Sequence, residues 1–78
     1  MKVTIKPVAV LRKFLPEGVT DQVELELPEG ATAADAAAAL GIPAGHAGVA
    51  FLDNQKADLD TVLQDGQVVG LIPPLGGG

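Results

Sequence analysis

Residues 63–78 read LQDGQVVGLIPPLGGG, an apolar run that meets two prolines and then stops in three glycines. Asp65-Gly66 is a strong turn signal, and residues 67–72 have the composition of a strand. Three successive glycines are rare by chance, because glycine makes up only about 7 % of average sequences. We therefore predict a final strand over 67–72 that delivers a bare tail, residues 73–78.

The tail suits a narrow path. Glycine has no side chain, so its backbone can pass where other residues cannot, while Pro73 and Pro74 favour an extended course. The tip is the α-carboxylate of Gly78, which is ionised at neutral pH and sterically unhindered. Such a carboxylate can attack the α-phosphate of ATP, and a sulfur or nitrogen nucleophile can open the resulting acyl adenylate. An inert, disordered terminus is the alternative that the tail alone leaves open.

Composition places the chain among small folded domains. It has 78 residues, of which 47 % are hydrophobic and 19 % are charged, which indicates one domain with a small core. Its apolar stretches are too short to span a bilayer, and Lys2, Lys6 and Pro7 interrupt any signal-peptide pattern. With the absence of cysteine, these features predict a soluble cytoplasmic protein.

Charge is unevenly distributed along the chain. The net charge is −5, all ten acids lie from Glu17 onward, and four of the five cations lie in the first thirteen positions. This balance disfavours nucleic acid as a partner, because phosphate contacts need clustered Lys and Arg. With two Phe and no Tyr or Trp, base stacking is disfavoured too. The acids either solubilise the protein or suit a partner with a basic face.

The first third of the chain predicts two strands. Residues 3–6 alternate, but Pro7 cannot donate to a sheet ladder, so we expect either a bulge or a non-bonding position there, before residues 8–11. Residues 12–15 predict a short helical turn or an irregular segment. Residues 22–27 alternate cleanly, with Glu24 and Glu26 on the solvated face of a half-buried strand.

The middle of the chain predicts one helix and two further strands. Thr32 and Asp35 form an N-terminal capping pair, and Gly41 ends a helix over 33–40. So short a helix must pack on a sheet to be stable. Strands are expected over 48–52 and 55–59, with a turn between them at Asp53-Asn54, because both residues tolerate a positive φ. A tight helical turn is expected over 60–63. The order β-β-α-β-β-β indicates an α+β fold with the helix on one face of a mixed sheet.

The chain has little catalytic equipment of its own. It lacks Cys, Ser and Tyr, and its single histidine, His46, lies in a Gly-Ala-rich loop, where we expect it to be exposed. No Ser-His or Cys-His pair can form, and one histidine is too few for zinc. Asp58 and Asp60 have calcium-loop spacing, but Val62 replaces the next oxygen ligand. We therefore predict no metal site and no bound cofactor.

Residues 63–78 resemble the end of the MoaD/ThiS family of ubiquitin-like sulfur carriers. The shared pattern is Leu, two positions, Gly, Asp or Gln, two apolar residues, and then Pro-Pro-x-x-Gly-Gly. The Pro-Pro pair is most similar to the molybdopterin synthase small subunit. The resemblance implies a ubiquitin-like β-grasp: a mixed sheet of four to five strands, one main helix on one face, and parallel first and last strands at its centre. It further implies a domain over 1–72 and a flexible tail over 73–78.

The same resemblance implies where the function lies. The carboxylate of Gly78 would be adenylated and converted to a thiocarboxylate. The other predicted site residues would contact partners; these are Leu71, Pro73, Pro74, Leu75, Gly76 and Gly77. Two departures from the family are Pro7 inside a central strand and Gly76, which makes the ending three glycines.

The implied partners are a ubiquitin-activating-enzyme-like adenylyltransferase, which uses ATP, and the molybdopterin synthase large subunit or another sulfur acceptor enzyme. Neither nucleic acid nor a membrane is expected as a partner. The most favoured role is molybdopterin (molybdenum or tungsten cofactor) biosynthesis, with the chain as a carrier and not an enzyme. Thiamine synthesis, tRNA thiolation, ubiquitin-like tagging of lysines and an inert interaction module remain as alternatives.

Overall fold

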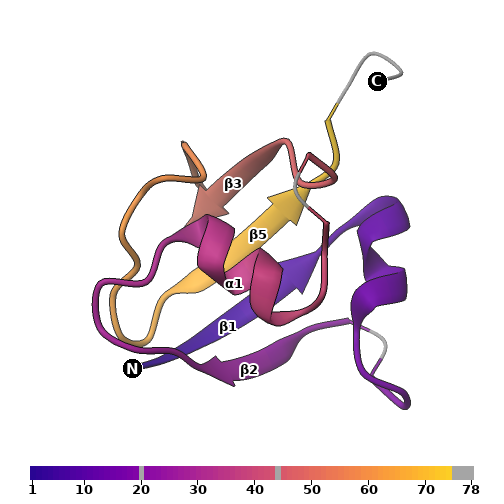
Figure 1. Cartoon of the computed structure of the whole chain (residues 1–78), viewed down its shortest axis with the longest axis horizontal. Coiled ribbons are helices and arrows are strands. Elements are labelled where there is room, and N and C mark those ends of the chain that lie inside the picture. The colour runs from indigo at the N-terminus through magenta and orange to yellow at the C-terminus, as the bar shows by residue number, and fades with distance from the viewer. Residues whose placement is uncertain (20, 44, 75–78) are drawn as a thin grey trace.

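The computed structural model describes residues 1–19, 21–43 and 45–74, which form one mixed sheet with a helix packed on it (Figure 1). The sheet has five strands in the order β2-β1-β5-β3-β4. The elements, in chain order, are β1 (Lys2–Pro7), the 3₁₀ helix η1 (Ala9–Phe14), β2 (Val23–Glu26), α1 (Ala33–Ala39), β3 (Val49–Leu52), β4 (Gln55–Ala57) and β5 (Val68–Ile72).

The first and last strands lie side by side at the centre of the sheet. β1 and β5 are parallel, in a register that runs from Thr4 opposite Val68 to Pro7 opposite Leu71. β2 flanks β1 and β3 flanks β5, both antiparallel. This is the β-grasp arrangement, so the predicted fold class is confirmed, with five strands and one main helix.

Pro7 occupies a non-bonding position at the end of β1. The Thr4 amide donates to the Gln67 carbonyl just before β5, and the Val8 amide donates to the Leu71 carbonyl of β5, each at a distance of 3.0 Å. The N–H groups of the intervening odd-numbered residues therefore point toward β2. The β1–β2 register ends at Ile5 opposite Val23, and at residue 7 no strand remains to accept a hydrogen bond. The missing N–H of Pro7 therefore costs no ladder bond, while its ring is buried in the core.

The sequence predicts that the strand resumes over residues 8–11 after Pro7, but the structure shows that it does not. After Val8 the chain turns into η1, beginning at Ala9 with a φ of 52°. The Val8 amide donates to the Leu71 carbonyl, one residue before β5 ends at Ile72. If β1 were longer, its further residues would have no strand residues of β5 to pair with. The turn instead inserts Leu11, only 1 % exposed, into the core.

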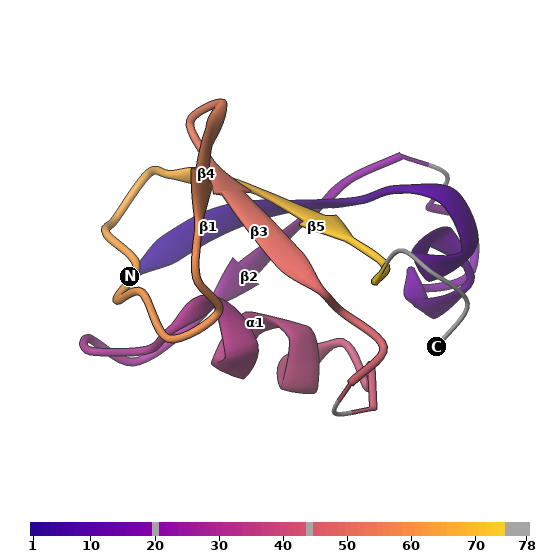
Figure 2. The ribbon, with the colours of Figure 1, turned by 90° about the horizontal axis from the view of Figure 1, so that it is seen from above.

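Helix α1 has the predicted N-terminus. The Asp35 amide donates to Thr32 Oγ1 over 3.2 Å, and the Thr32 amide donates to the Asp35 carboxylate over 2.9 Å. This reciprocal pair satisfies two amides that the first turn leaves without partners. Gly41 follows the helix with a φ of 83°, which suits glycine at this end. Figure 2 shows α1 against one face of the sheet.

Residues 59–63 are the second departure from expectation. Instead of a helical turn, the chain makes a turn at Leu59-Asp60 and then runs extended, with Val62 bridged to Thr32. The Leu63 amide donates to the Ala31 carbonyl over 2.8 Å, and the Leu63 side chain is buried. Pairing with the segment before α1 satisfies backbone groups that an isolated turn of helix would leave open.

The core lies between α1 and the sheet. The fully buried large side chains include Val3, Ile5 and Pro7 of β1 and Val69 and Leu71 of β5. Ala33 and Ala36 of α1, each 0 % exposed, let the helix approach these strands closely. The β3–β4 hairpin turns at Asp53-Asn54, both with positive φ as predicted. Within the described ranges no helix is both long and apolar enough to cross a membrane.

Candidate functional site

The strand that carries the tail presents different residues to its two faces. Val69 and Leu71 point into the core, whereas Val68, Gly70 and Ile72 alternate onto the face that α1 does not cover. We call this uncovered side the open face. Ile72, the last residue of β5, lies on the open face, and the tail follows directly after it. β5 therefore contributes to the open face and also leads into the tail.

A shallow hollow marks the centre of the open face. Gly70 lies between Lys6 of β1 and Phe51 of β3 in the sheet register. Its lack of a side chain leaves a concavity of about 370 Å³. The walls of this hollow are formed by Lys6, Val8, Phe51, Asn54, Val68 and Ile72.

A second hollow continues from the first to the root of the tail. It measures about 480 Å³ and shares Phe51 and Ile72 with the first. Its other lining residues are Gly48, Val49, Lys56, Pro73 and Pro74. The five aliphatic and aromatic side chains of the two hollows form one surface, which we call the apolar patch: Val8, Val49, Phe51, Val68 and Ile72.

Two cations flank the apolar patch. Lys6 and Lys56 are exposed, and neither makes an ion pair within the described ranges. Asp53 lies in the β3–β4 turn, and its carboxylate accepts a hydrogen bond from the Val68 amide at 3.2 Å. The strand that carries Glu24 and Glu26 is separated from β5 by β1. These two lysines suit a partner whose interface has an acidic rim. The expectation of a partner with a basic face therefore does not apply to the apolar patch.

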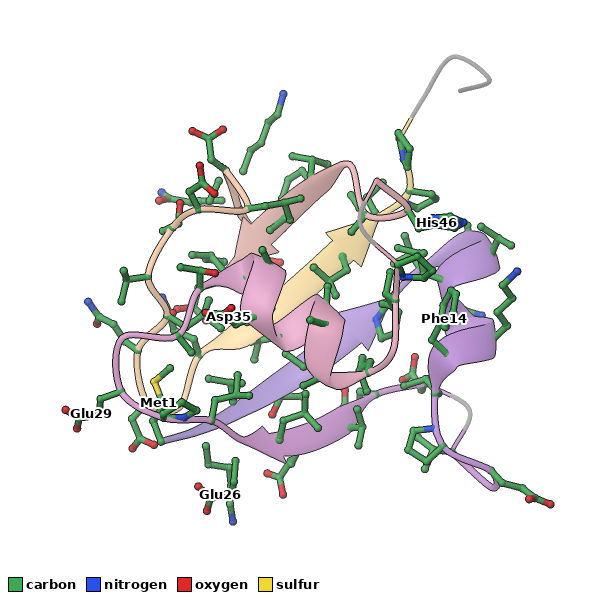
Figure 3. The ribbon with its side chains drawn as sticks, in the orientation of Figure 1. Met1, Phe14, Glu26, Glu29, Asp35 and His46 are labelled. Atoms are coloured by element: carbon green, nitrogen blue, oxygen red, sulfur yellow. The ribbon has the colours of Figure 1, made fainter. Side chains whose placement is uncertain are left out.

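A third, smaller groove lies on the other side of the tail root. It measures about 250 Å³ and is formed by η1, the loop 45–46 and the two prolines. His46 is exposed here, as predicted, and it lies beside Phe14 at the end of the molecule where β5 stops (Figure 3). The Lys13 ammonium stands 5.4 Å from the centre of the Phe14 ring.

The structure tests only part of the predicted site. Leu71 was expected to contact partners; its side chain is 0 % exposed and packs in the core, so it offers no surface to a partner in this structure. Pro73 is half-buried and Pro74 is exposed. The predicted roles of Leu75, Gly76, Gly77 and Gly78 lie outside the described residues, and the role of the Gly78 carboxylate stays a prediction.

Sequence reasoning missed most of the open face. The place of Ile72 on the open face could have been predicted, because successive side chains of a strand point to opposite faces and Leu71 points into the core. Phe51 and Val8 come from other parts of the chain, and strand order alone brings them beside β5. The sequence places Gly70 in a strand and predicts no other role for it, whereas in the structure it forms the floor of the first hollow. Across residues 1–19, 21–43 and 45–74 no group of three acids or histidines is placed to hold a metal.

Comparison with known families agrees with this geometry. A model of the ThiS family matches residues 8–78. The chain belongs to the ThiS/MoaD family. Its members are β-grasp sulfur carriers, small proteins that are not enzymes. The match begins after β1 and spans η1, every later strand, α1 and the tail.

Solved structures of similar proteins share the fold over nearly the whole chain. A Pyrococcus furiosus protein, provisionally assigned as molybdopterin converting factor subunit 1, is 32 % identical, with a TM-score of 0.68 and coverage of 95 % of this chain and 98 % of its own. SAMP1 (small archaeal modifier protein 1) of Haloferax volcanii is 23 % identical, with a TM-score of 0.72 and full coverage of both chains.

A third neighbour comes from a complex. It belongs to a structure of subunits 1 and 2 of the Helicobacter pylori molybdopterin-converting factor, at 21 % identity, with a TM-score of 0.60 and full coverage of both chains. Among curated protein sequences, none matches this chain at a significant level.

Proposed function

We propose that this chain carries sulfur for molybdopterin biosynthesis on the carboxylate of Gly78. The observation that carries the proposal is the continuity of the apolar patch with the root of the glycine-ending tail on one central strand. A partner that binds the patch thereby receives the tail in a defined place. The 32 % identity to a provisionally assigned molybdopterin converting factor subunit 1 supports the choice of pathway.

The first step is activation. A Gly78 carboxylate oxygen attacks the α-phosphorus of ATP, the bond from that phosphorus to the bridging oxygen breaks, and pyrophosphate leaves. A hydrosulfide-level nucleophile then attacks the carbonyl carbon of the acyl adenylate. AMP leaves with the electron pair of the C–O bond, and Gly78 becomes a thiocarboxylate. The ATP and the sulfur source belong to the activating partner.

The second step is delivery. The thiocarboxylate sulfur attacks an electrophilic carbon of the acceptor's substrate. The bond from that carbon to its leaving group breaks, the leaving group departs with the electron pair, and a thioester forms. Water then attacks the carbonyl carbon, which releases the sulfur on the product as a thiol and regenerates the Gly78 carboxylate. The chain leaves this cycle unchanged, as a carrier must. An enzyme like subunit 2 of the Helicobacter pylori complex is the proposed acceptor.

Docking is assigned to the apolar patch. A partner side chain that enters the hollow over Gly70 would contact Phe51 and Ile72, and such central apolar contacts supply most of the binding free energy in interfaces. Lys6 and Lys56 lie at the rim, where charges mainly raise the association rate. The activating enzyme and the acceptor would use the same face in turn, because each must receive the same tail.

The test separates a carrier from a tag. Both roles begin with the same adenylate, so activation alone does not discriminate between them. Intact-mass measurement of protein isolated from its own cells should show oxygen replaced by sulfur at Gly78. Adducts of Gly78 on target lysines, without any sulfur exchange, would instead support a modifier role, as in the name of the Haloferax volcanii small archaeal modifier protein 1.

A second experiment tests the pathway. Chain carrying the thiocarboxylate is incubated with a molybdopterin synthase large subunit and the sulfur-free pterin precursor. Formation of the dithiolene product supports the proposal. Sulfur transfer only to a thiamine precursor or to tRNA, with their own acceptor enzymes, would reassign the chain to one of those routes.

A further inference from the structure

Gly48 lies under the root of the tail. It directly precedes β3, and its amide donates to the Ile72 carbonyl over 2.8 Å. A β-carbon built on Gly48 would lie 2.6 Å from Pro74 Cα and 2.8 Å from Pro74 N. Ordinary carbon–carbon contacts are about 3.5–4.0 Å. The space above Gly48 is therefore filled by the backbone of the tail.

The need for glycine here is steric and not conformational. Five other glycines have positive φ, but each has open space where a β-carbon would stand; they are Gly18, Gly30, Gly41, Gly45 and Gly66. Gly48 is not among the positive-φ glycines. Gly70 in β5 would make only an ordinary contact of 3.5 Å with Phe51 Cβ. Gly48 alone among these glycines combines ordinary backbone conformation with close approach to another segment.

We propose that Gly48 is a positioning residue that sets the direction in which the tail leaves the sheet. This inference rests on the proposed function, because direction matters only if the tail must reach a partner's site. The N–H of residue 48 is held by Ile72, and Val49 pairs with Ile72 in the ladder. Pro74 follows the ladder and is exposed. A β-carbon at position 48 therefore displaces Pro74, by about 1 Å, and leaves the sheet in place.

The two prolines transmit the displacement of Pro74 to the chain that follows them. Pro73 and Pro74 each have a fixed φ, so a shift at the root changes the direction of the chain that follows. Reaction of the Gly78 carboxylate with ATP requires near-attack geometry, and a misplacement of about 1 Å can lower a rate by about 100-fold. Docking through the apolar patch uses side chains that Gly48→Ala does not alter. The rate of adenylation should therefore fall, while docking should not.

The experiment compares wild type and Gly48→Ala in ATP–pyrophosphate exchange with the adenylyltransferase that activates this chain. We expect kcat to fall about tenfold or more, with KM and the thermal midpoint near the wild-type values. Wild-type kcat in the variant would overturn the inference, as would a raised KM at unchanged kcat. A variant that fails to fold would also overturn it, because residue 48 would then support the sheet and not the path of Pro74.

A double-variant comparison separates steering from a purely structural role. In a background with Pro73→Gly and Pro74→Gly, the root is no longer stiff, and adding Gly48→Ala should change kcat less than about threefold. Equal losses in both backgrounds would contradict steering. If wild type itself shows no exchange, the proposed function fails. The packing of Gly48 on Pro74 is then still tested by NOEs between their α-protons in the free protein, and absence of those NOEs would contradict the positioning inference itself.

Discussion

The two faces of the sheet bury apolar side chains to different extents, and the two faces have different roles. Under α1, Ala33 and Ala36 are each 0 % exposed and close tightly on the strands. On the open face, Val68 is 39 % exposed and Ile72 is half-buried beside a hollow over Gly70. The covered face holds the fold together, and the open face is left for a partner. Variants at matched positions on the two faces can break or sharpen this contrast.

The largest effect is expected at Gly78, the last residue of the tail. Deletion of Gly78 should abolish ATP–pyrophosphate exchange, because it retracts the carboxylate by about 3.5 Å. The free energy of unfolding should change by less than about 0.5 kcal/mol, as for surface changes in general. Exchange kinetics and chemical denaturation measure the two quantities.

The third glycine provides a control within this experiment, since the shortened chain still ends in Gly-Gly. Exchange by the shortened chain would mean that the partner reads the final dipeptide and not the distance from the folded body. Gly78→Trp should fail under either account, because a slim passage excludes a large side chain. Full exchange by Gly78→Trp would overturn the carrier proposal.

Neighbouring residues of β5 give the most direct comparison of the two faces. Leu71→Ala should lower the free energy of unfolding by about 2–5 kcal/mol, because it leaves a cavity in the core. Ile72→Ala should weaken docking to the adenylyltransferase by about 1–2 kcal/mol, the cost of truncating a central interface contact, with a much smaller effect on stability. Calorimetric binding and urea unfolding of both variants test this. Equal stability losses would show that the two faces are not separate.

Helix α1 tests how tightly the covered face is packed. Ala36→Leu adds volume at a fully buried position and should destabilise the fold by about 1–3 kcal/mol. Ala39→Leu is the matched control, since Ala39 lies in the same helix but is exposed, and its effect should stay within about 0.5 kcal/mol. Thermal unfolding measures both. A neutral Ala36→Leu would mean that the helix does not lie close on the strands.

The smallest effects are expected at the rim of the open face. Lys6→Gln and Lys56→Gln should each weaken docking by about 0.2–1 kcal/mol, mainly through a slower association rate. The loss should shrink at high salt because screening weakens exposed charges. Lys2→Gln is the control, because Lys2 is exposed on β1 at the end remote from Pro7. Stopped-flow association at two salt concentrations tests the order, and tighter docking by either rim variant would contradict an acidic partner rim.

Local sequence signals located most of the elements. The Thr32–Asp35 pair predicted the start of α1, and Asp53-Asn54 predicted the hairpin turn, because caps and turns depend on a few adjacent residues. The two errors, at residues 8–11 and 60–63, occur where the conformation depends on a distant partner. Residues 8–11 run out of strand to pair with, and Leu63 finds its hydrogen bond at Ala31.

The features of the site also fall into two groups: those set by the local sequence and those set by tertiary packing. The order of residues alone determines three features of the site. These are the alternation that sets Leu71 and Ile72 on opposite faces, the Pro-Pro pair, and the glycine-ending tail with its carboxylate. Which face stays open, and which side chains gather around Ile72, depend on where α1 packs and on the strand order that places β1 and β3 beside β5. The contact between Gly48 and Pro74 joins residues 26 positions apart. Such contacts follow from packing the whole chain at once, because no local preference of either residue specifies its neighbour in space.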